Sequence, residues 1–206
     1  MGAVSGENNH GGRPVRADAL RNEDALLEAA KAAFAEAGVD APARDIASRA
    51  GVGVGTLYRR FPTRADLVAA VFRREVDACA ADAVRLAESH EPREALVRWL
   101  FRYTDFIATK RGLAAALHSG DPAFEALPAY FQSNFEPALA GLLERAAAEG
   151  AVRSDVAPFD LLRAIGNLAV GSGPDPVGHT RRMVGLLIDG LHRTDHQSAK
   201  TAPGHS

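Results

Sequence analysis

The chain of 206 residues is long enough to bury a substantial core, and one compact body with a small appendage is expected. Its apolar fraction of 47%, charged fraction of 24% and net charge of −2 are typical of globular proteins and give no global sign of a nucleic-acid partner. Cys79 is the single cysteine, which excludes an intrachain disulfide and a cysteine metal cluster.

The first part of the chain predicts an arm followed by four helices. Residues 1–15 are Gly-rich and polar, and we expect them to be disordered. Apolar residues at helical spacing then predict helices over residues 18–37, 42–50, 54–61 and about 64–89. Gly38 and Pro62 are expected to end two of these helices, and Thr63 is expected to cap the fourth.

The second part of the chain also has a helical pattern. We expect helices over residues 92–109, 113–118, 158–170 and 175–192, together with one that ends at Glu149. Pro122, Pro128 and Pro137 are expected to break up the region before Glu149. Residues 193–206 resemble the first stretch and predict a disordered tail. No alternating strand pattern occurs, so the predicted fold class is all-α.

Residues 43–61 have the anatomy of a helix-turn-helix. Small and apolar side chains give the two short helices an inner face, and Gly51 permits the sharp turn between them. The inner positions are Ile46, Ala47, Ala50, Val52, Leu57 and Phe61. The residues left to point outward are Val54, Gly55, Thr56, Tyr58, Arg59 and Arg60.

The outward residues are typical of a helix that reads the major groove of DNA. Arginine donates to phosphates and to guanine, and a threonine methyl contacts thymine. Positive charge also gathers here: residues 44–64 hold five arginines against Asp45 alone, a local balance of +4, so the remainder of the chain sums to −6. This segment is therefore predicted to meet a polyanion.

The same segment resembles the DNA-binding signature of the TetR family of repressors. The likeness rests on residues 45–47, 50–52, 55–58, Phe61 and 63–67. It implies that Thr56, Tyr58 and Arg60 touch DNA and that Arg44 and Arg64 contact phosphates. With the outward face, the predicted DNA-binding residues are Arg44, Val54, Gly55, Thr56, Tyr58, Arg59, Arg60, Thr63 and Arg64. Gly53 departs from the family, since many members carry a capping serine there.

The later part of the chain resembles one subgroup of that family, the SbtR-like regulators. Residues 108–117, 121–124 and 186–191 carry this likeness. The resemblance implies a DNA-binding domain over residues 16–62 and a helical domain for ligand binding and dimerisation over residues 63–192. The expected function is a ligand-responsive repressor that binds a palindromic operator as a homodimer and is released by a small-molecule effector, which the sequence does not name.

Two sets of residues are candidates for the regulatory domain. The pocket candidates are the large side chains Phe72, Val76, Trp99, Tyr103, Phe106, Leu117, His118, Phe131 and Phe135. The dimer-interface candidates are Leu161, Ile165, Leu168, Val184, Leu187, Ile188 and Leu191. Core packing remains an alternative for every residue in both sets.

The sequence holds no catalytic or metal-binding constellation. Its seven histidines are scattered without ligand spacing, so we expect no metal, no cofactor and no enzyme. No apolar run reaches the length of a membrane span and no signal peptide is evident, so a cytoplasmic location is expected. The alternative class is a helical enzyme or ligand carrier whose basic segment only packs; salt-dependent DNA binding separates it from a regulator.

Overall fold

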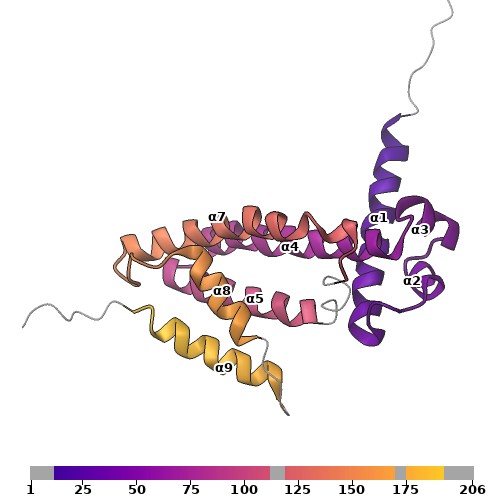
Figure 1. The fold of residues 1–206 in the computed structure, drawn as a ribbon. Coiled ribbons are helices and arrows are strands. Elements are labelled where there is room, and N and C mark those ends of the chain that lie inside the picture. Colours follow the sequence, from indigo (N-terminus) through magenta and orange to yellow (C-terminus); the bar gives the residue numbers. More distant parts are fainter. Residues whose placement is uncertain (1–11, 112–118, 170–174, 193–206) are drawn as a thin grey trace, which may run out of the picture. The chain divides into compact units, whose positions relative to one another are not determined.

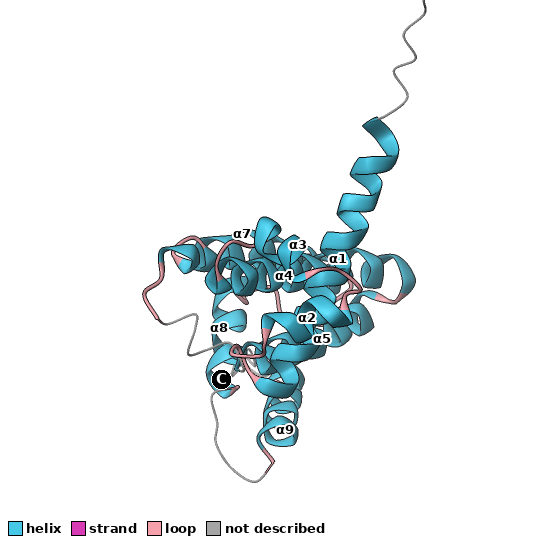
Figure 2. Cartoon of the chain, turned by 90° about the vertical axis from the view of Figure 1, so that its right-hand side faces the viewer, coloured by secondary structure: helices cyan, strands magenta, loops and turns pink. Residues whose placement is uncertain are grey.

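The computed structural model describes residues 12–111, 119–169 and 175–192, and within these ranges it contains helices and loops but no strand (Figures 1 and 2). The predicted all-α fold class is therefore confirmed. The chain divides into two compact units: Met1–Arg74 with Arg111–Leu127, and Glu75–Lys110 with Pro128–Ser206. None of the helices in the described part is long and apolar enough to cross a membrane.

The described part of the first unit contains α1 Gly12–Ala37, α2 Ala43–Arg49, α3 Val54–Arg60, the beginning of α4 Arg64–Ser89 and a short 3₁₀ turn, η1 Pro122–Phe124. Helix α1 begins at Gly12, whereas the sequence pattern predicted a start near Asp18. Pro14 does not prevent the earlier start, because the first turn of a helix needs no intrahelical N–H donor. Residues 1–11, the rest of the expected arm, lie outside the described residues.

The core of the first unit explains why it continues into α4. The predicted domain boundary between residues 62 and 63 concerns function and stays a prediction; by packing, the first unit includes α4 as far as Arg74. The first turns of α4 bury apolar side chains, as do helices α1, α2 and α3. The buried residues include Leu27, Ala30 and Phe34 of α1, Ile46 and Ala47 of α2, Leu57 of α3, and Leu67, Val68 and Val71 of α4.

The second unit holds the end of α4 together with α5 Pro92–Arg111, α7 Leu127–Ala148, α8 Pro158–Leu168 and α9 Pro176–Asp189. The 3₁₀ turn η1, which precedes α7 in the chain, belongs to the first unit. The predicted helix at 113–118 falls outside the described residues. The tail 193–206 falls outside them too.

Pro137 lies inside α7 and does not break it, contrary to the prediction. A proline in a helix removes one hydrogen bond to the carbonyl four residues earlier, here that of Ser133. Ser133 and Pro137 are both exposed, so water can satisfy that carbonyl. The buried side chains of Phe135 and Leu139 hold the helix on both sides of the proline.

An aromatic cluster forms the centre of the second unit. Phe135 packs edge-to-face against Tyr103 at 5.3 Å and against Phe131 at 4.8 Å between ring centroids. Trp99 stacks on Tyr103 and donates from its indole N–H to the carbonyl of Cys79 at 2.8 Å. Burial raises the pKa of Cys79 to about 12, so its thiol stays protonated and packs as a small apolar group.

Replacing Phe135 with alanine should lower the free energy of unfolding by about 3–5 kcal/mol, because a fully buried aromatic side chain leaves a cavity. Urea denaturation followed by circular dichroism measures the loss. Val84→Ala is the control, since Val84 on α4 is 60% exposed and its loss should change stability by less than about 0.5 kcal/mol. Equal stability of the two variants would contradict the assignment of Phe135 to the core.

Candidate nucleic-acid interface

The turn between α2 and α3 is fixed by backbone hydrogen bonds and one glycine. Gly51 has a φ of +70°, a conformation that side chains with a Cβ disfavour. Its N–H donates to the carbonyl of Ser48 at 3.1 Å, and the N–H of Val52 donates to the carbonyl of Ala47 at 3.0 Å. This pair of bonds is a Schellman motif, so the predicted role of Gly51 in the turn is confirmed.

Apolar anchors hold α3 against the rest of the unit. Leu57 is buried, as are Ile46 and Ala47 of α2, which confirms the predicted inner face at these positions. Phe61 follows α3 directly and is buried as well, while Val52 in the turn is half-buried. Four of these side chains therefore fix the orientation of a helix that is only seven residues long.

The opposite side of α3 faces solvent. Tyr58 is 52% exposed although it is a large aromatic residue. Gly55, Arg59 and Arg60 are exposed as well, whereas Val54 and Thr56 are half-buried. The helix thus presents polar, basic and aromatic groups together on one surface, as the sequence predicted. Of the two half-buried residues, Thr56 accepts a hydrogen bond from Arg59 at 3.1 Å.

The start of α3 has no side-chain cap. Gly53 occupies the N-cap position, and its carbonyl accepts from the N–H of Thr56 at 2.9 Å. No side-chain oxygen is present at this position to accept from the other free N–H groups of the first turn. These groups remain donors for water or for a phosphate.

Thr63 caps α4, as the sequence predicted. Its hydroxyl accepts from the N–H of Asp66 at 3.0 Å, and the carboxylate of Asp66 accepts from the N–H of Thr63 at 3.0 Å. The two residues form a reciprocal capping box with aspartate in the place of glutamate. The Thr63 hydroxyl also donates to that carboxylate at 2.8 Å, so its hydrogen-bonding capacity is largely used within the protein.

The two arginines that the family likeness assigns to phosphates have different surroundings. Arg64 is half-buried, donates to the carbonyl of Ala41 and lies over the ring of Phe34 at 5.4 Å. It therefore ties α4 to α1 and to the segment before α2. Arg44 is exposed at the start of α2 and forms no hydrogen bond or ion pair with any residue in the described ranges.

Helix α1 carries a set of acidic residues that the sequence analysis did not single out. Each pairs with an arginine from another helix: Glu36 with Arg49 of α2, Glu23 with Arg60 of α3, and Glu28 with Arg74 of α4. Two hydrogen bonds from Arg49 lower the pKa of Glu36, and one hydrogen bond from Arg74 lowers the pKa of Glu28. A sequence shows the acids and the arginines but not which of them meet.

Five of the candidate pocket residues, Trp99, Tyr103, Phe106, Phe131 and Phe135, form the aromatic cluster of the second unit. Val76, Trp99, Tyr103, Phe106 and Phe135 are buried, Phe131 is half-buried, and Phe72, in the first unit, is buried. Leu117 and His118 lie outside the described residues. Their role in binding an effector stays a prediction.

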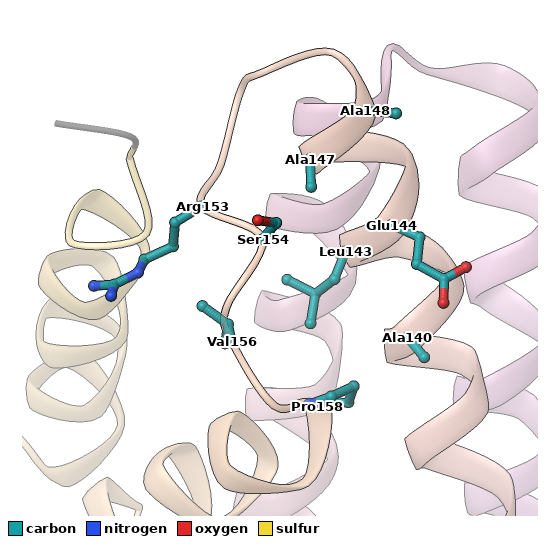
Figure 3. Close-up of a pocket in the computed structure, with 9 residues that line it drawn as sticks. All are labelled: Ala140, Leu143, Glu144, Ala147, Ala148, Arg153, Ser154, Val156 and Pro158. Carbon is teal, nitrogen blue, oxygen red and sulfur yellow. The ribbon is translucent and has the colours of Figure 1, made fainter. Parts of the chain in front are cut away.

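A groove of about 480 Å³ lies elsewhere in this unit, between α7 and the segment that leads into α8 (Figure 3). Leu143 and Val156 line it, and the guanidinium of Arg153 points away from Glu144. Arg153 instead pairs with Asp155 at 2.5 Å. None of the seven candidate pocket residues that the structure describes lines this groove.

The dimer-interface candidates lie mostly inside the protomer. Five of them are buried within the single chain, namely Leu161, Ile165, Val184, Ile188 and Leu191. Leu168 and Leu187 are half-buried. The apolar stripes of α8 and α9 therefore contribute to the protomer's own core. The most exposed of the large apolar residues on α9 is Leu186, which is 64% exposed.

Two segments of the sequence match families of bacterial transcription regulators. Residues 26–71 match the family of bacterial regulatory proteins called the tetR family, and residues 91–193 match the C-terminal domain of SbtR-like transcriptional regulators. No curated protein sequence matches the chain.

Solved structures agree with these matches. A TetR transcriptional regulator from Streptomyces coelicolor is 39% identical, with 83% of this chain and 98% of that chain covered and a TM-score of 0.71. A TetR regulatory protein from Mycobacterium vanbaalenii is 34% identical, with 87% and 100% covered and a TM-score of 0.67. A ketosteroid transcriptional regulator from Mycobacterium tuberculosis, at 23% identity and a TM-score of 0.52 over 93% and 100% of the two chains, shows the fold alone.

Substituting Gly51 with alanine should lower the free energy of unfolding by about 1–2 kcal/mol, because the turn requires a positive φ. Thermal and urea unfolding measure the change. Gly55→Ala is the control: Gly55 lies in helical backbone, and no atom lies within 4 Å of the place a Cβ would take, so stability should be kept or slightly raised. A Gly51→Ala protein as stable as the Gly55→Ala protein would contradict the strained turn.

Proposed function

The chain belongs to the TetR family of bacterial regulatory proteins, and on this premise we propose that it is a repressor that binds a palindromic operator as a homodimer. The observation that carries the proposal is the exposed surface of α3, which buried Leu57 and Phe61 hold in place. An α-helix with such a surface fits the major groove, and its first residues contact base edges.

We assign roles on DNA to the predicted contact residues according to their surroundings. Tyr58 and Arg59 are exposed and are proposed to read the groove or its backbone, with Val54, Gly55 and Thr56 at the close-approach end of α3. Arg44, which has no ion-pair partner in the described part of the chain, is proposed to contact a phosphate. Arg64 and Thr63 are proposed to act mainly by fixing the start of α4, since their polar atoms are engaged.

We propose that an apolar small molecule is the effector and that it binds at the aromatic cluster of the second unit. Tyr103 supplies the polar group: its hydroxyl donates to the carbonyl of Leu162 over 3.3 Å, a long bond that an effector oxygen can replace. Phe106, Phe131 and Phe135 would supply apolar walls. An effector that binds one conformation more tightly shifts the population away from the DNA-binding form.

We propose that α8 and α9 form the dimer interface through the sides that the protomer core leaves uncovered. Leu186 is exposed, and Leu168 and Leu187 are half-buried. Gly166 and Gly185 meet no atom within 4 Å of an added Cβ, so they leave room for a partner helix. The buried candidates of the sequence analysis would support this surface from within.

Arg44→Ala should weaken binding to duplex DNA about equally for all sequences and reduce the salt dependence by one phosphate contact. The slope of log K against log salt should change by about 0.9. Fluorescence anisotropy over a salt series measures it. Arg98→Ala is the control, because Arg98 is an exposed arginine of α5 paired with Glu94. A wild-type affinity that does not depend on salt would contradict the proposed function.

Leu186→Arg should weaken the homodimer about tenfold or more, because a charged side chain would be placed in an apolar interface. Analytical ultracentrifugation over a concentration series measures the dissociation constant. Val84→Arg is the matched control, since Val84 is 60% exposed and belongs to α4, which is not part of the proposed interface. Equal dissociation constants for the two variants would contradict the assignment of the dimer to α9.

A further inference from the structure

Arg60 is the DNA-facing arginine whose charge is already balanced within the protein. Its guanidinium donates to the carboxylate of Glu23 on α1. Within the described part of the first unit, this is the one ion pair that involves a residue of α3. Arg59 on the same helix donates to a neutral hydroxyl, and Arg44 has no acidic partner among the described residues.

The geometry leaves the pair accessible to DNA. The side chain of Arg60 is 57% exposed and that of Glu23 is 24% exposed. A guanidinium has five N–H donors, and the contact with Glu23 uses one terminal nitrogen of Arg60. The exposed part of the Arg60 side chain leaves donors for a further acceptor beside the carboxylate. A phosphate that approaches Arg60 therefore meets a negative charge at the same place.

Only one residue of the Arg60–Glu23 pair lies within the segment that matches the tetR family. The match to the tetR family covers residues 26–71, which include Arg60 but not Glu23. The acidic partner is placed by the early part of α1, whose later turns are packed into the core through Leu26 and Leu27. Both residues lie in the first compact unit.

We propose that Glu23 is a positioning residue that determines DNA specificity by holding Arg60. In the free protein and on arbitrary DNA, Arg60 stays with Glu23, and the carboxylate reduces the attraction of α3 for phosphates. On the operator, where the whole surface of α3 is seated, Arg60 exchanges Glu23 for DNA. Glu23 would thus weaken complexes with arbitrary DNA more than the complex with the operator, and this difference gives specificity. This inference rests on the proposed DNA-binding function.

A purely structural role makes a different prediction. An exposed ion pair between two helices contributes little to stability, so its loss would leave DNA binding unchanged if it only tied α1 to α3. The decisive readout is therefore the affinity and salt dependence of binding to non-operator DNA, not the melting temperature.

The test compares wild type with Glu23→Gln, which keeps the shape of the side chain and removes its charge. The probes are a mixed-sequence duplex and a duplex selected by the wild-type protein from a random pool. Glu23→Gln should bind the mixed-sequence duplex about two- to fivefold more tightly, the scale of one exposed ion pair. The salt slope for that duplex should steepen by up to about 0.9. The selected duplex should gain less, so the specificity ratio should fall.

Glu36→Gln is the matched control, because Glu36 lies on the same helix and pairs with Arg49, which is not a predicted contact. Glu36→Gln should change the affinities for the mixed-sequence duplex and for the selected duplex much less than Glu23→Gln does. The effect of Glu23→Gln should also disappear in an Arg60→Ala background, since it acts through Arg60.

Three results would overturn the inference while leaving the proposed function intact. They are an unchanged or weaker affinity of Glu23→Gln for the mixed-sequence duplex, an equal gain on both duplexes, and a gain that persists without Arg60. Failure of the proposed function is seen separately, as wild-type protein that shows no salt-dependent binding to either duplex. Circular dichroism melting of each variant establishes that the differences arise in folded protein.

Discussion

Helix α3 spans only Val54–Arg60, and a helix of this length is unstable in water by itself. Its position depends on the burial of Leu57 and Phe61 and on the left-handed backbone of Gly51. Together these features determine the orientation of α3 relative to α2. The start of α3 lacks a side-chain cap at Gly53, so the helix is stabilised more by packing than by local hydrogen bonds. The proposed DNA-binding surface therefore depends on the packing of the core beneath it.

The charge on this surface is governed by α1. Acidic side chains of α1 meet arginines of α2, α3 and α4, so part of the local positive balance is neutralised within the first unit. Arg44 and Arg59 remain without acidic partners among the described residues, whereas Arg60 is held by Glu23. The arginines near α3 therefore differ in whether an acidic side chain pairs with them, a difference that the sequence alone does not reveal.

Local features were predictable from the sequence, and tertiary pairings were not. The turn at Gly51, the cap at Thr63 and the inner positions Ile46, Ala47 and Leu57 follow from spacing and residue type, and all three are found. Pro137 was expected to break a helix, but the packing of Phe135 and Leu139 overrides its local preference. The aliphatic stripes of α8 and α9 did not reveal which side faces the core, because a core and an interface share the same composition. The partners of Glu23 and Arg64 depend on how helices cross.

The most direct test of the central claim, that α3 and its turn form the DNA-binding surface, is hydrogen–deuterium exchange with and without a selected duplex. Peptides covering residues 51–61 should exchange more slowly in the complex, because DNA shields the exposed face of α3 and stabilises a helix that depends on its packing. Peptides from the middle of α7 serve as the internal reference. Protection elsewhere, with residues 51–61 exchanging at the same rate in both states, would contradict the account.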